Sequence, residues 1–377
     1  MKTVCNENKC TGCMACVDIC AKNAIHIVDA IDAFNAVIDE GKCINCGMCE
    51  KVCQQKNVPQ LRSPIIWEQG WTYDDKTRMR SASGGIATEL ARTFIEKGGK
   101  VCSCLFRGGD FVFDIVEDVN RLDCFAGSKY IKSNPTGIYK TIKRELARKT
   151  EILFIGLPCQ VAALRNYVGD SLGEKLTTVD LICHGTPSPK ILDMFLKQYG
   201  EDIRTAESID FRVKGNFQVS ERSHTIATRG VCDRYMISFL SALSYTENCY
   251  SCKYAQENRP GDITLGDSWG TELSENEWHK GVSLVLCQTE KGKSLLELAK
   301  IKLVDVNIEK AKSHNHQLEH PSKAPKSREK FIKHIKHGMK FNRAVLLALP
   351  KDCGKQAVKE ILIKCKLLAP GGGNVSN

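Results

Sequence analysis

Apolar side chains that recur every three or four positions predict a helix after residue 85. In the stretch SASGGIATELARTFIEKGGKVCSCLF, which starts at residue 81, these positions are Ile86, Leu90, Phe94 and Ile95. The small residues before the helix are Ser83, Gly84 and Gly85. Backbone N–H groups at such a start can approach an anion or a flat ring, although serine and glycine also occur there simply as caps. The run KVCSCLF after the helix predicts a strand.

Two later stretches each read as a buried strand, a tight loop and a helix. They are EILFIGLPCQVAALRNYVG, from residue 151, and LTTVDLICHGTPSPKILDMFLKQYG, from residue 176. Strands that alternate with helices predict an α/β domain with a site at the carboxyl ends of its strands. The residues at these ends are Pro158, Cys159 and Gln160 in the first stretch, and Cys183, His184 and Gly185 in the second.

The rest of the pattern is less regular. Lys129 and Tyr130 precede an amphipathic helix, and residues 205–245 favour strands. The run DITLGDSW predicts a strand that ends at Asp267 and Trp269. A strand VSLVLCQTE, a helix from about Lys291 and an amphipathic C-terminal helix follow, and the final PGGGNVSN is expected to be disordered. The stretch NVPQLRSPIIWEQGW, with two prolines, favours a linker.

The predicted fold class is therefore α/β, with a small cysteine-rich domain ahead of a larger α/β domain. We expect three regions: residues 1–57, residues 58–345, and a C-terminal helix and tail over 346–377. The middle region would divide into an N-terminal part, about 65–145, and a C-terminal part, about 150–310.

The first region owes its assignment to eight cysteines. The runs CTGCMACVDIC and CINCGMCEKVC share the spacing Cys-x2-Cys-x2-Cys-x3-Cys, which in bacterial ferredoxins holds two 4Fe–4S clusters. In that arrangement the fourth cysteine of each run ligates the other cluster. One cluster would be held by Cys10, Cys13, Cys16 and Cys53, and the second by Cys20, Cys43, Cys46 and Cys49. The first region is therefore predicted to be a small bacterial-type ferredoxin domain.

Zinc or disulfides are the alternatives for these cysteines. Zinc sites usually pair Cys-x2-Cys units across a spacer, which is not the spacing here. Disulfides need an oxidising compartment, and the sequence shows neither a signal-peptide core nor an apolar run long enough to span a membrane. We therefore expect a cytoplasmic protein whose 20 cysteines are metal ligands or free thiols.

Charge is unevenly distributed along the chain, whose formal net charge is +10. Residues 310–377 hold 15 Lys and Arg against 4 Asp and Glu, whereas residues 1–60 hold six Lys and seven Asp and Glu. The basic region lacks interleaved aromatic residues, so a docking surface or solvated helical face is expected rather than a nucleic-acid site. This distribution favours an electron-transfer protein or enzyme as partner.

Four further cysteines occupy loop positions: Cys159, Cys183, Cys249 and Cys252. Four thiolates are what a third cubane needs. Equally, the first two could be buried thiols and the Cys-x2-Cys pair a redox pair or half of a zinc site. The cysteines in strand-like or helical contexts are expected to be packing residues: Cys102, Cys104, Cys124, Cys232, Cys287, Cys353 and Cys365.

In order, the segments SASGGIATEL, GSKY, GLPCQVAAL, ICHGTPS and NCYSCKYAQENRPGDITLGDSWG resemble the beta-subunit family of coenzyme F-420 (a deazaflavin) hydrogenase/dehydrogenase. The resemblance covers about residues 65–345, and a ferredoxin module is a common fusion in this family. It implies FAD and a third 4Fe–4S cluster on Cys159, Cys183, Cys249 and Cys252. It also implies flavin contacts at Ser83, Gly84, Gly85, Lys129 and Tyr130, with Gln160, His184, Asp267 and Trp269 lining the pocket.

The resemblance implies an iron–sulfur flavoprotein oxidoreductase. Such an enzyme would take an electron pair from a reduced deazaflavin or nicotinamide through FAD and pass single electrons through the clusters to a partner. No GxGxxG fingerprint supports direct nicotinamide binding. The alternative is a non-catalytic ferredoxin-type subunit that delivers electrons to a neighbouring enzyme. The catalytic residues, the donor and the acceptor are not determined by the sequence.

Overall fold

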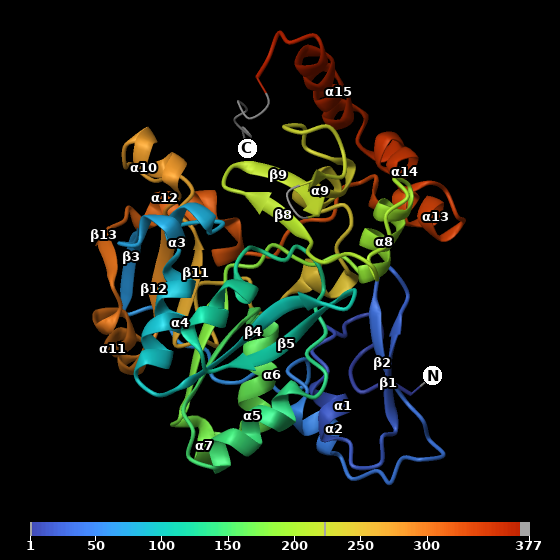
Figure 1. The fold of residues 1–377 in the computed structure, drawn as a ribbon. Helices are drawn as coiled ribbons and strands as arrows, with labels where there is room; N and C mark the ends of the chain where they lie inside the picture. Colours follow the sequence, from blue (N-terminus) through green and yellow to red (C-terminus); the bar gives the residue numbers. More distant parts are fainter. Residues whose placement is uncertain (1, 222–223, 370–377) are drawn as a thin grey trace.

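The computed structural model describes residues 2–221 and 224–369, which form a small head and a larger body (Figure 1). The head comprises residues 2–57, drawn in blue, and the body comprises the remaining described residues. The mixed α/β architecture confirms the predicted fold class. The predicted disordered tail, PGGGNVSN, lies outside the described residues.

The head consists of two short helices and one hairpin. Helices α1 (Ala15–Ile19) and α2 (Met48–Val52) each follow a cysteine loop, and β1 (Ile25–Asp29) pairs antiparallel with β2 (Phe34–Ile38). The residue before each helix has a left-handed backbone conformation, with φ of 61° at Met14 and 72° at Gly47. A glycine at this position avoids the steric cost that Met14 bears. The two halves of the head therefore repeat one loop geometry.

An eight-stranded mixed sheet forms the centre of the body, in the order β13-β3-β12-β11-β7-β6-β4-β5. Its strands are β3 (Ile66–Thr72), β4 (Lys100–Arg107), β5 (Asp110–Val116), β6 (Ile152–Gly156), β7 (Leu176–Leu181), β11 (Ile263–Asp267), β12 (Ser283–Cys287) and β13 (Ile301–Asp305). Strands β4, β6, β7 and β11 are parallel. Both predicted strand–loop–helix units are present, and their strands β6 and β7 are neighbours buried on both faces. The sequence of β6 is continuously apolar, as burial on both faces favours, whereas β7 also buries polar side chains.

Helices cover both faces of this sheet. Helices α4 (Ile86–Glu96) and α11 (Glu290–Leu298) pack on one face, around Leu153 of β6. Helices α5 (Ile138–Ala147) and α6 (Pro158–Val168) pack on the other, around Phe154. The second cluster also contains Ala15 and Val52 from the two helices of the head. Head and body therefore share a hydrophobic core.

The predicted linker is wrong for its second half. Residues Ile66–Thr72 form strand β3, which lies inside the sheet between β13 and β12. Trp71 in this strand is only 9 % exposed. The isolated bridge between Arg62 and Arg259 already ties the preceding residues to the body. The two prolines lie just before the strand and do not mark a flexible linker.

A third layer lies above the carboxyl ends of the parallel strands (Figure 1). It contains the sheet of β8 (Asp210–Val213), β9 (Asn216–Glu221) and β10 (His224–Thr225), with α8 (Pro189–Lys197), α9 (Arg234–Leu240), α13 (Arg328–Lys336) and α14 (Phe341–Ala348). The remaining elements are α3 (Asp75–Arg80), η1 (Val119–Phe125), α7 (Asp170–Gly173), η2 (Glu247–Ser251), α10 (Glu275–Lys280), α12 (Ile308–His314), η3 (His316–Leu318) and α15 (Pro350–Lys364).

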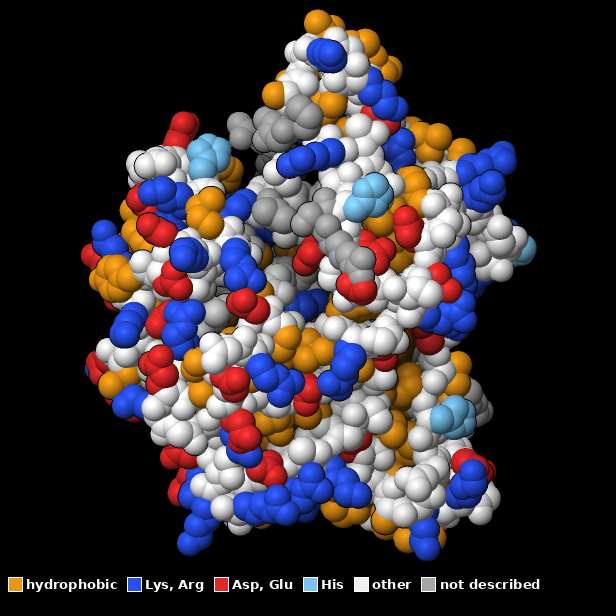
Figure 2. Space-filling model, viewed as in Figure 1, with side chains coloured by type: hydrophobic (Ala, Val, Ile, Leu, Met, Phe, Trp, Pro, Cys, Tyr) orange, Lys and Arg blue, Asp and Glu red, His pale blue; other side chains and the backbone are white. Residues whose placement is uncertain are grey.

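Helix α15 projects at the top of the view, and hydrophobic side chains gather at its tip (Figures 1 and 2). Its exposed side chains include Val358 and Ile361, at 59 % and 60 %. Within the described part of the chain, every helix falls short of the length and hydrophobicity that a bilayer-spanning helix needs.

Of the seven cysteines predicted to pack, Cys124 and Cys365 are exposed, so that prediction is wrong for these two.

Candidate cofactor and cluster site

A cavity of about 1210 Å³ opens at the carboxyl ends of β6, β7 and β11 and is also lined by residues of β8 and β9. Small-molecule pockets usually measure about 300–1,000 Å³, so this cavity has room for a ligand larger than most. Eight of the nine predicted flavin contacts line it: Ser83, Gly85, Lys129, Tyr130, Gln160, His184, Asp267 and Trp269. The prediction of a site at the strand ends thus agrees with the position of the cavity.

Gly84, the ninth predicted contact, lies behind the wall. A Cβ atom added to it would lie 2.3 Å from the carbonyl oxygen of Gly70 and 2.9 Å from the nitrogen of Ser283. Its N–H donates to Ser283 Oγ at 3.0 Å. Glycine at this position therefore lets the chain pass close to β3 and β12. Gly85, with φ of 81°, directly precedes helix α4 at the cavity wall.

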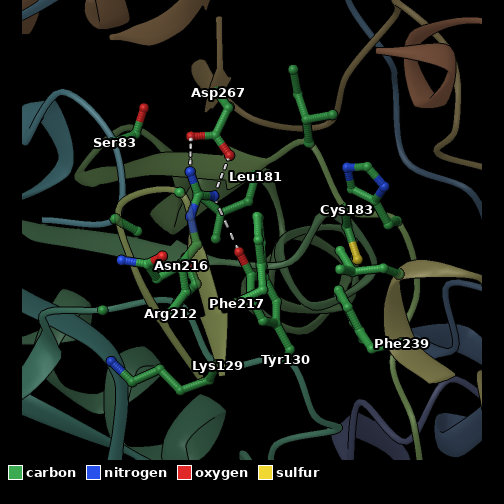
Figure 3. A pocket seen from close by; sticks show the side chains of 18 of the residues that line it. Ser83, Lys129, Tyr130, Leu181, Cys183, Arg212, Asn216, Phe217, Phe239 and Asp267 are labelled. Atoms are coloured by element: carbon green, nitrogen blue, oxygen red, sulfur yellow. Dashed lines mark hydrogen bonds and ion pairs between the residues drawn. The ribbon is translucent and has the colours of Figure 1, made fainter. Parts of the chain in front are cut away.

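A charged cluster that the sequence did not reveal lies in the cavity. Arg212 of β8 forms a two-point ion pair with Asp267, with N–O distances of 2.6 and 3.1 Å, and its Nη1 lies 3.3 Å from the Tyr130 hydroxyl (Figure 3). The Arg212 side chain is only 6 % exposed. Although burial opposes the charge, Asp267 raises the pKa of Arg212 overall. Arg212 is therefore a fixed cation in the wall.

Aromatic rings continue this wall. The Tyr130 ring stacks on Phe239 with centroids 4.5 Å apart, and the Arg212 guanidinium lies 4.7 Å from the Phe217 ring centroid. Flat aromatic and guanidinium faces suit a flat heteroaromatic ligand. Residues 205–245 carry no recognisable motif, so neither Arg212 nor Phe217 could be chosen from the sequence.

Lys129 is positioned by the backbone around it. Its Nζ donates to the carbonyl oxygens of Phe125 and Ala126 at 2.7 and 2.8 Å. Burial lowers the pKa of Lys129. The structure therefore places a desolvated amine at the cavity wall, where an anionic ligand would be its natural counter-charge.

Gln160 and His184 line the cavity, and each directly follows a predicted cluster cysteine in the chain. Gln160 Oε1 accepts from the Leu157 N–H at 2.9 Å, and its Nε2 donates to Ser133 Oγ at 2.9 Å, so it caps helix α6 as well as lining the wall. His184 Nδ1 lies 2.7 Å from Gln317 Nε2. Burial, and then His316, lower the pKa of His184 to about 4. His184 is therefore neutral at pH 7.

Cys159, Cys183, Cys249 and Cys252 come from three separate segments and lie near one another beside the cavity. Burial, followed by Cys252 and Cys183, raises the pKa of Cys159. Burial, followed by Cys249 and Cys252, raises the pKa of Cys183 to about 12. Such mutual effects require the four thiols to lie near one another. Cys183 itself lines the cavity, so the set borders directly on the site.

One of these thiols accepts a hydrogen bond from the backbone. The Thr186 N–H donates to Cys249 Sγ at 3.4 Å, and hydrogen bonds of this kind stabilise thiolates in iron–sulfur sites. A tetrahedral zinc site with Zn–S bonds of about 2.3 Å would hold its sulfurs roughly 3.8 Å apart. Across residues 2–221 and 224–369, no three His, Cys, Asp or Glu side chains converge closely enough to hold a single metal ion. Four thiols are the number of ligands that a 4Fe–4S cluster needs.

The head brings the first of its two predicted cysteine sets together. Cys10, Cys13, Cys16 and Cys53 surround one small hollow, and Cys5 lies beside it. The pKa of Cys13 is raised to about 12 by burial, and then by Cys10 and Cys53. The members of the second set are more accessible, with Cys46 exposed and Cys20, Cys43 and Cys49 half-buried. The position of Cys53 among the first set is the crossed arrangement that the spacing predicts.

Comparison with known proteins agrees with the head's assignment. Residues 9–57 match the family model described as "4Fe-4S dicluster domain". The fold and these cysteines thus define an iron–sulfur protein with a two-cluster head.

Residues 149–311 match the family model for the C terminus of the beta subunit of coenzyme F420 hydrogenase/dehydrogenase. This part of the chain therefore belongs to the coenzyme F420 hydrogenase/dehydrogenase beta-subunit family, which confirms the family predicted from the motifs. That family is one of oxidoreductase subunits.

A solved structure shows the same fold. A chain in the xenon-derivatised F420-reducing [NiFe] hydrogenase complex from Methanosarcina barkeri aligns over 74 % of this chain and 95 % of its own length, with a TM-score of 0.51. The sequence identity is 17 %, so this similarity concerns the fold alone. A comparison with curated proteins gave no match.

Proposed function

We propose that this chain is an iron–sulfur flavoprotein oxidoreductase that moves electrons between a two-electron carrier, such as deazaflavin coenzyme F420, and a one-electron partner. The observation that carries the proposal is the meeting of four cysteines from three segments at Cys183, on the wall of the large cavity. A site for a redox cofactor and a site for a cluster thus share one residue. The family of residues 149–311 supports the same assignment.

The cavity residues would bind and orient FAD. Tyr130 and Phe239 offer a stacked aromatic face, and the start of helix α4 at Gly85 offers backbone N–H groups for phosphate. Lys129 and Arg212 supply positive charge at the wall. When bound, FAD would supply the exchange between paired and single electrons that clusters by themselves do not perform. No residue of the cavity is assigned to proton transfer.

A continuous set of buried contacts connects the body cysteines with the head. The Tyr254 hydroxyl donates to Gln54 Oε1 at 2.7 Å, and Gln54 Nε2 donates to Thr11 Oγ1 at 2.8 Å. Burial, followed by Cys159 and Cys13, raises the pKa of Tyr254, so its ring lies between the two cysteine sets. These contacts hold the body set and the first head set in a fixed relation, as electron transfer between them would require.

The second set of the head would be the exit to a partner. Cys46 is exposed, and the neighbouring Ile44 and Met48 are 61 % and 41 % exposed. Exposed apolar side chains around a redox site suit a transient protein contact. The first set is buried, so the second is the one that a one-electron partner could approach.

Cofactor analysis of anaerobically isolated full-length protein tests the proposal. We expect about twelve iron and twelve sulfide per chain, as three cubanes require, together with one FAD. Addition of reduced coenzyme F420, with NADPH in a parallel sample, should bleach both flavin and cluster absorption with one of the two donors. Two cubanes and no flavin would refute the proposal and favour the electron-delivering subunit.

A cysteine variant with a matched control localises the third cluster. Cys159→Ala should lower iron to about eight per chain and leave the ferredoxin-type signals intact. Cys287→Ala is the control, because Cys287 is buried in strand β12 and belongs to neither cysteine arrangement. Equal iron loss in the two variants would contradict the assignment of Cys159.

A further inference from the structure

Lys132 joins the body to the head through a buried amine. It is 5 % exposed, and its Nζ donates to the carbonyl oxygen of Thr11 at 3.0 Å. Its stem packs so closely on Gly12 that a Cβ atom added there would lie 2.9 Å from Lys132 Cδ. Its Nζ lies 5.1 Å from the centroid of the Phe34 ring. A lysine of the body thus ends inside the cysteine loop of the head.

The other side of Lys132 faces the body cysteines. The next residue, Ser133, accepts a hydrogen bond from Gln160 at 2.9 Å, and Gln160 follows Cys159 in the chain. The pKa of Cys10 is lowered mainly by its hydrogen bond with Cys5, and the positive charge of Lys132 adds to that effect. Burial raises the pKa of Cys159 overall, and the charge of Lys132 opposes this rise. Lys132 therefore lies between the first head set and the body set.

The surroundings of this cation lack a conventional counter-charge. Burying an ammonium costs several kcal/mol unless it is paired. Among residues 2–221 and 224–369, no carboxylate forms an ion pair with Lys132, and one carbonyl oxygen and one aromatic ring are weak compensation. Four thiolates around an oxidised 4Fe–4S core carry about −2, so clusters at both neighbouring sites would provide the missing negative charge.

We propose that Lys132 is a shared counter-charge that makes the first head cluster and the body cluster easier to reduce. The inference rests on the proposed function, because it needs clusters at both sites. Each reduction adds one electron and one negative charge to a cluster and forms no bond. A fixed cation between the two sites stabilises the added charge at either of them. Lys132 acts on potentials and does not contact a substrate.

Redox titration of the anaerobic full-length protein, followed by electron paramagnetic resonance, tests this role. We expect Lys132→Met to lower the one-electron reduction equilibrium constant of both neighbouring clusters at least tenfold, or about 59 mV. The cluster on Cys20, Cys43, Cys46 and Cys49 should move less and serves as an internal reference. Lys132→Arg, which keeps the charge, should keep potentials close to the wild type.

Lys190→Met is the matched control. Lys190 Nζ also joins body to head by donating to a backbone carbonyl, that of Asp29 at 2.7 Å, but this contact is exposed. Unchanged potentials in Lys132→Met, equal shifts at all three clusters, or the same shifts in Lys190→Met would overturn the proposal.

Loss of the neighbouring clusters is also informative. If Lys132→Met and Lys132→Gln lose their iron while Lys132→Arg and Lys190→Met retain it, the charge is needed to hold the clusters, which supports the inference. Iron loss in Lys132→Arg as well would overturn it. A wild-type protein without the body cluster would instead refute the proposed function, so the two failures are distinguishable.

Discussion

Arg259 is predicted to hold the body cysteines in place. Its side chain is 1 % exposed and pairs with Asp180, which is fully buried, through N–O distances of 2.9 and 2.7 Å. It also donates to the carbonyl oxygen of Tyr254 at 2.6 Å and to that of Leu181 at 2.8 Å. Arg259 therefore joins the segment that carries Cys252 to the end of β7, which precedes Cys183.

Replacement of Arg259 by Met should be costly. Removal of one partner from a buried ion pair typically lowers the free energy of unfolding by about 3–5 kcal/mol, because the remaining charge is left uncompensated. The two carbonyl groups also lose their charged donor, and each buried unsatisfied group costs about 1–3 kcal/mol. Since such terms are not additive, we expect a total loss of about 3–5 kcal/mol together with reduced iron in the body site.

Urea unfolding of the isolated full-length protein measures the stability loss, and iron analysis measures the cluster. Arg204→Met is the control, because Arg204 pairs with Asp202 in an exposed position, with side chains 78 % and 33 % accessible. Such a pair contributes about 0–1 kcal/mol. Adding Asp180→Leu to Arg259→Met should recover part of the stability, because an apolar pair removes the unpaired charge. If Arg259→Met were no more destabilising than Arg204→Met and kept its iron, the reasoning would be refuted.

Three further outcomes follow from individual contacts. Burial opposes ionisation of Asp262, but Arg165, 3.1 Å away, is foremost among the groups that lower the pKa of Asp262 overall. The unfolded state then binds the proton more tightly than the folded state, so ionised Asp262 stabilises the fold above about pH 4, and this stabilisation is lost as the pH falls further. Asp262→Asn should therefore flatten the acid limb of a pH–stability curve. An unchanged acid limb would contradict this reasoning. Gly84→Ala should lower the free energy of unfolding, measured in urea, by about 1–3 kcal/mol. Gly173→Ala is the control and should be nearly neutral, because a Cβ added there meets nothing within 4 Å. Equal effects of the two substitutions would contradict the close packing of Gly84. Arg212→Met should weaken FAD retention at least tenfold in equilibrium dialysis, and retention equal to the wild type would remove Arg212 from the flavin site.

The local patterns of the chain predicted several elements well. The apolar spacing from Ile86 to Ile95 predicted the helix now seen as α4, because helical periodicity is a property of neighbouring residues. The continuous apolar run ILFIG predicted β6, because a strand covered on both faces needs no polar side. Strand β7 was predicted because the same order of strand, loop and helix recurs there, although its sequence LTTVDL is partly polar. The linker prediction was wrong because two prolines give no information about which strands the following residues, Ile66–Thr72, will pair with. That pairing depends on strands more than 200 residues further along the chain.

The site divides in the same way. Cysteine spacing by itself determined the two-cluster head, because ligands of one cubane recur within a few residues and their spacing leaves a signature. The body set required folding to bring together positions as distant as Cys159 and Cys252, and spacing could not decide between a cluster and separate thiols. Arg212 and Lys132 left no signature at all. Their importance arises from burial beside groups of opposite charge or beside thiols, and burial is a property that only the tertiary structure creates.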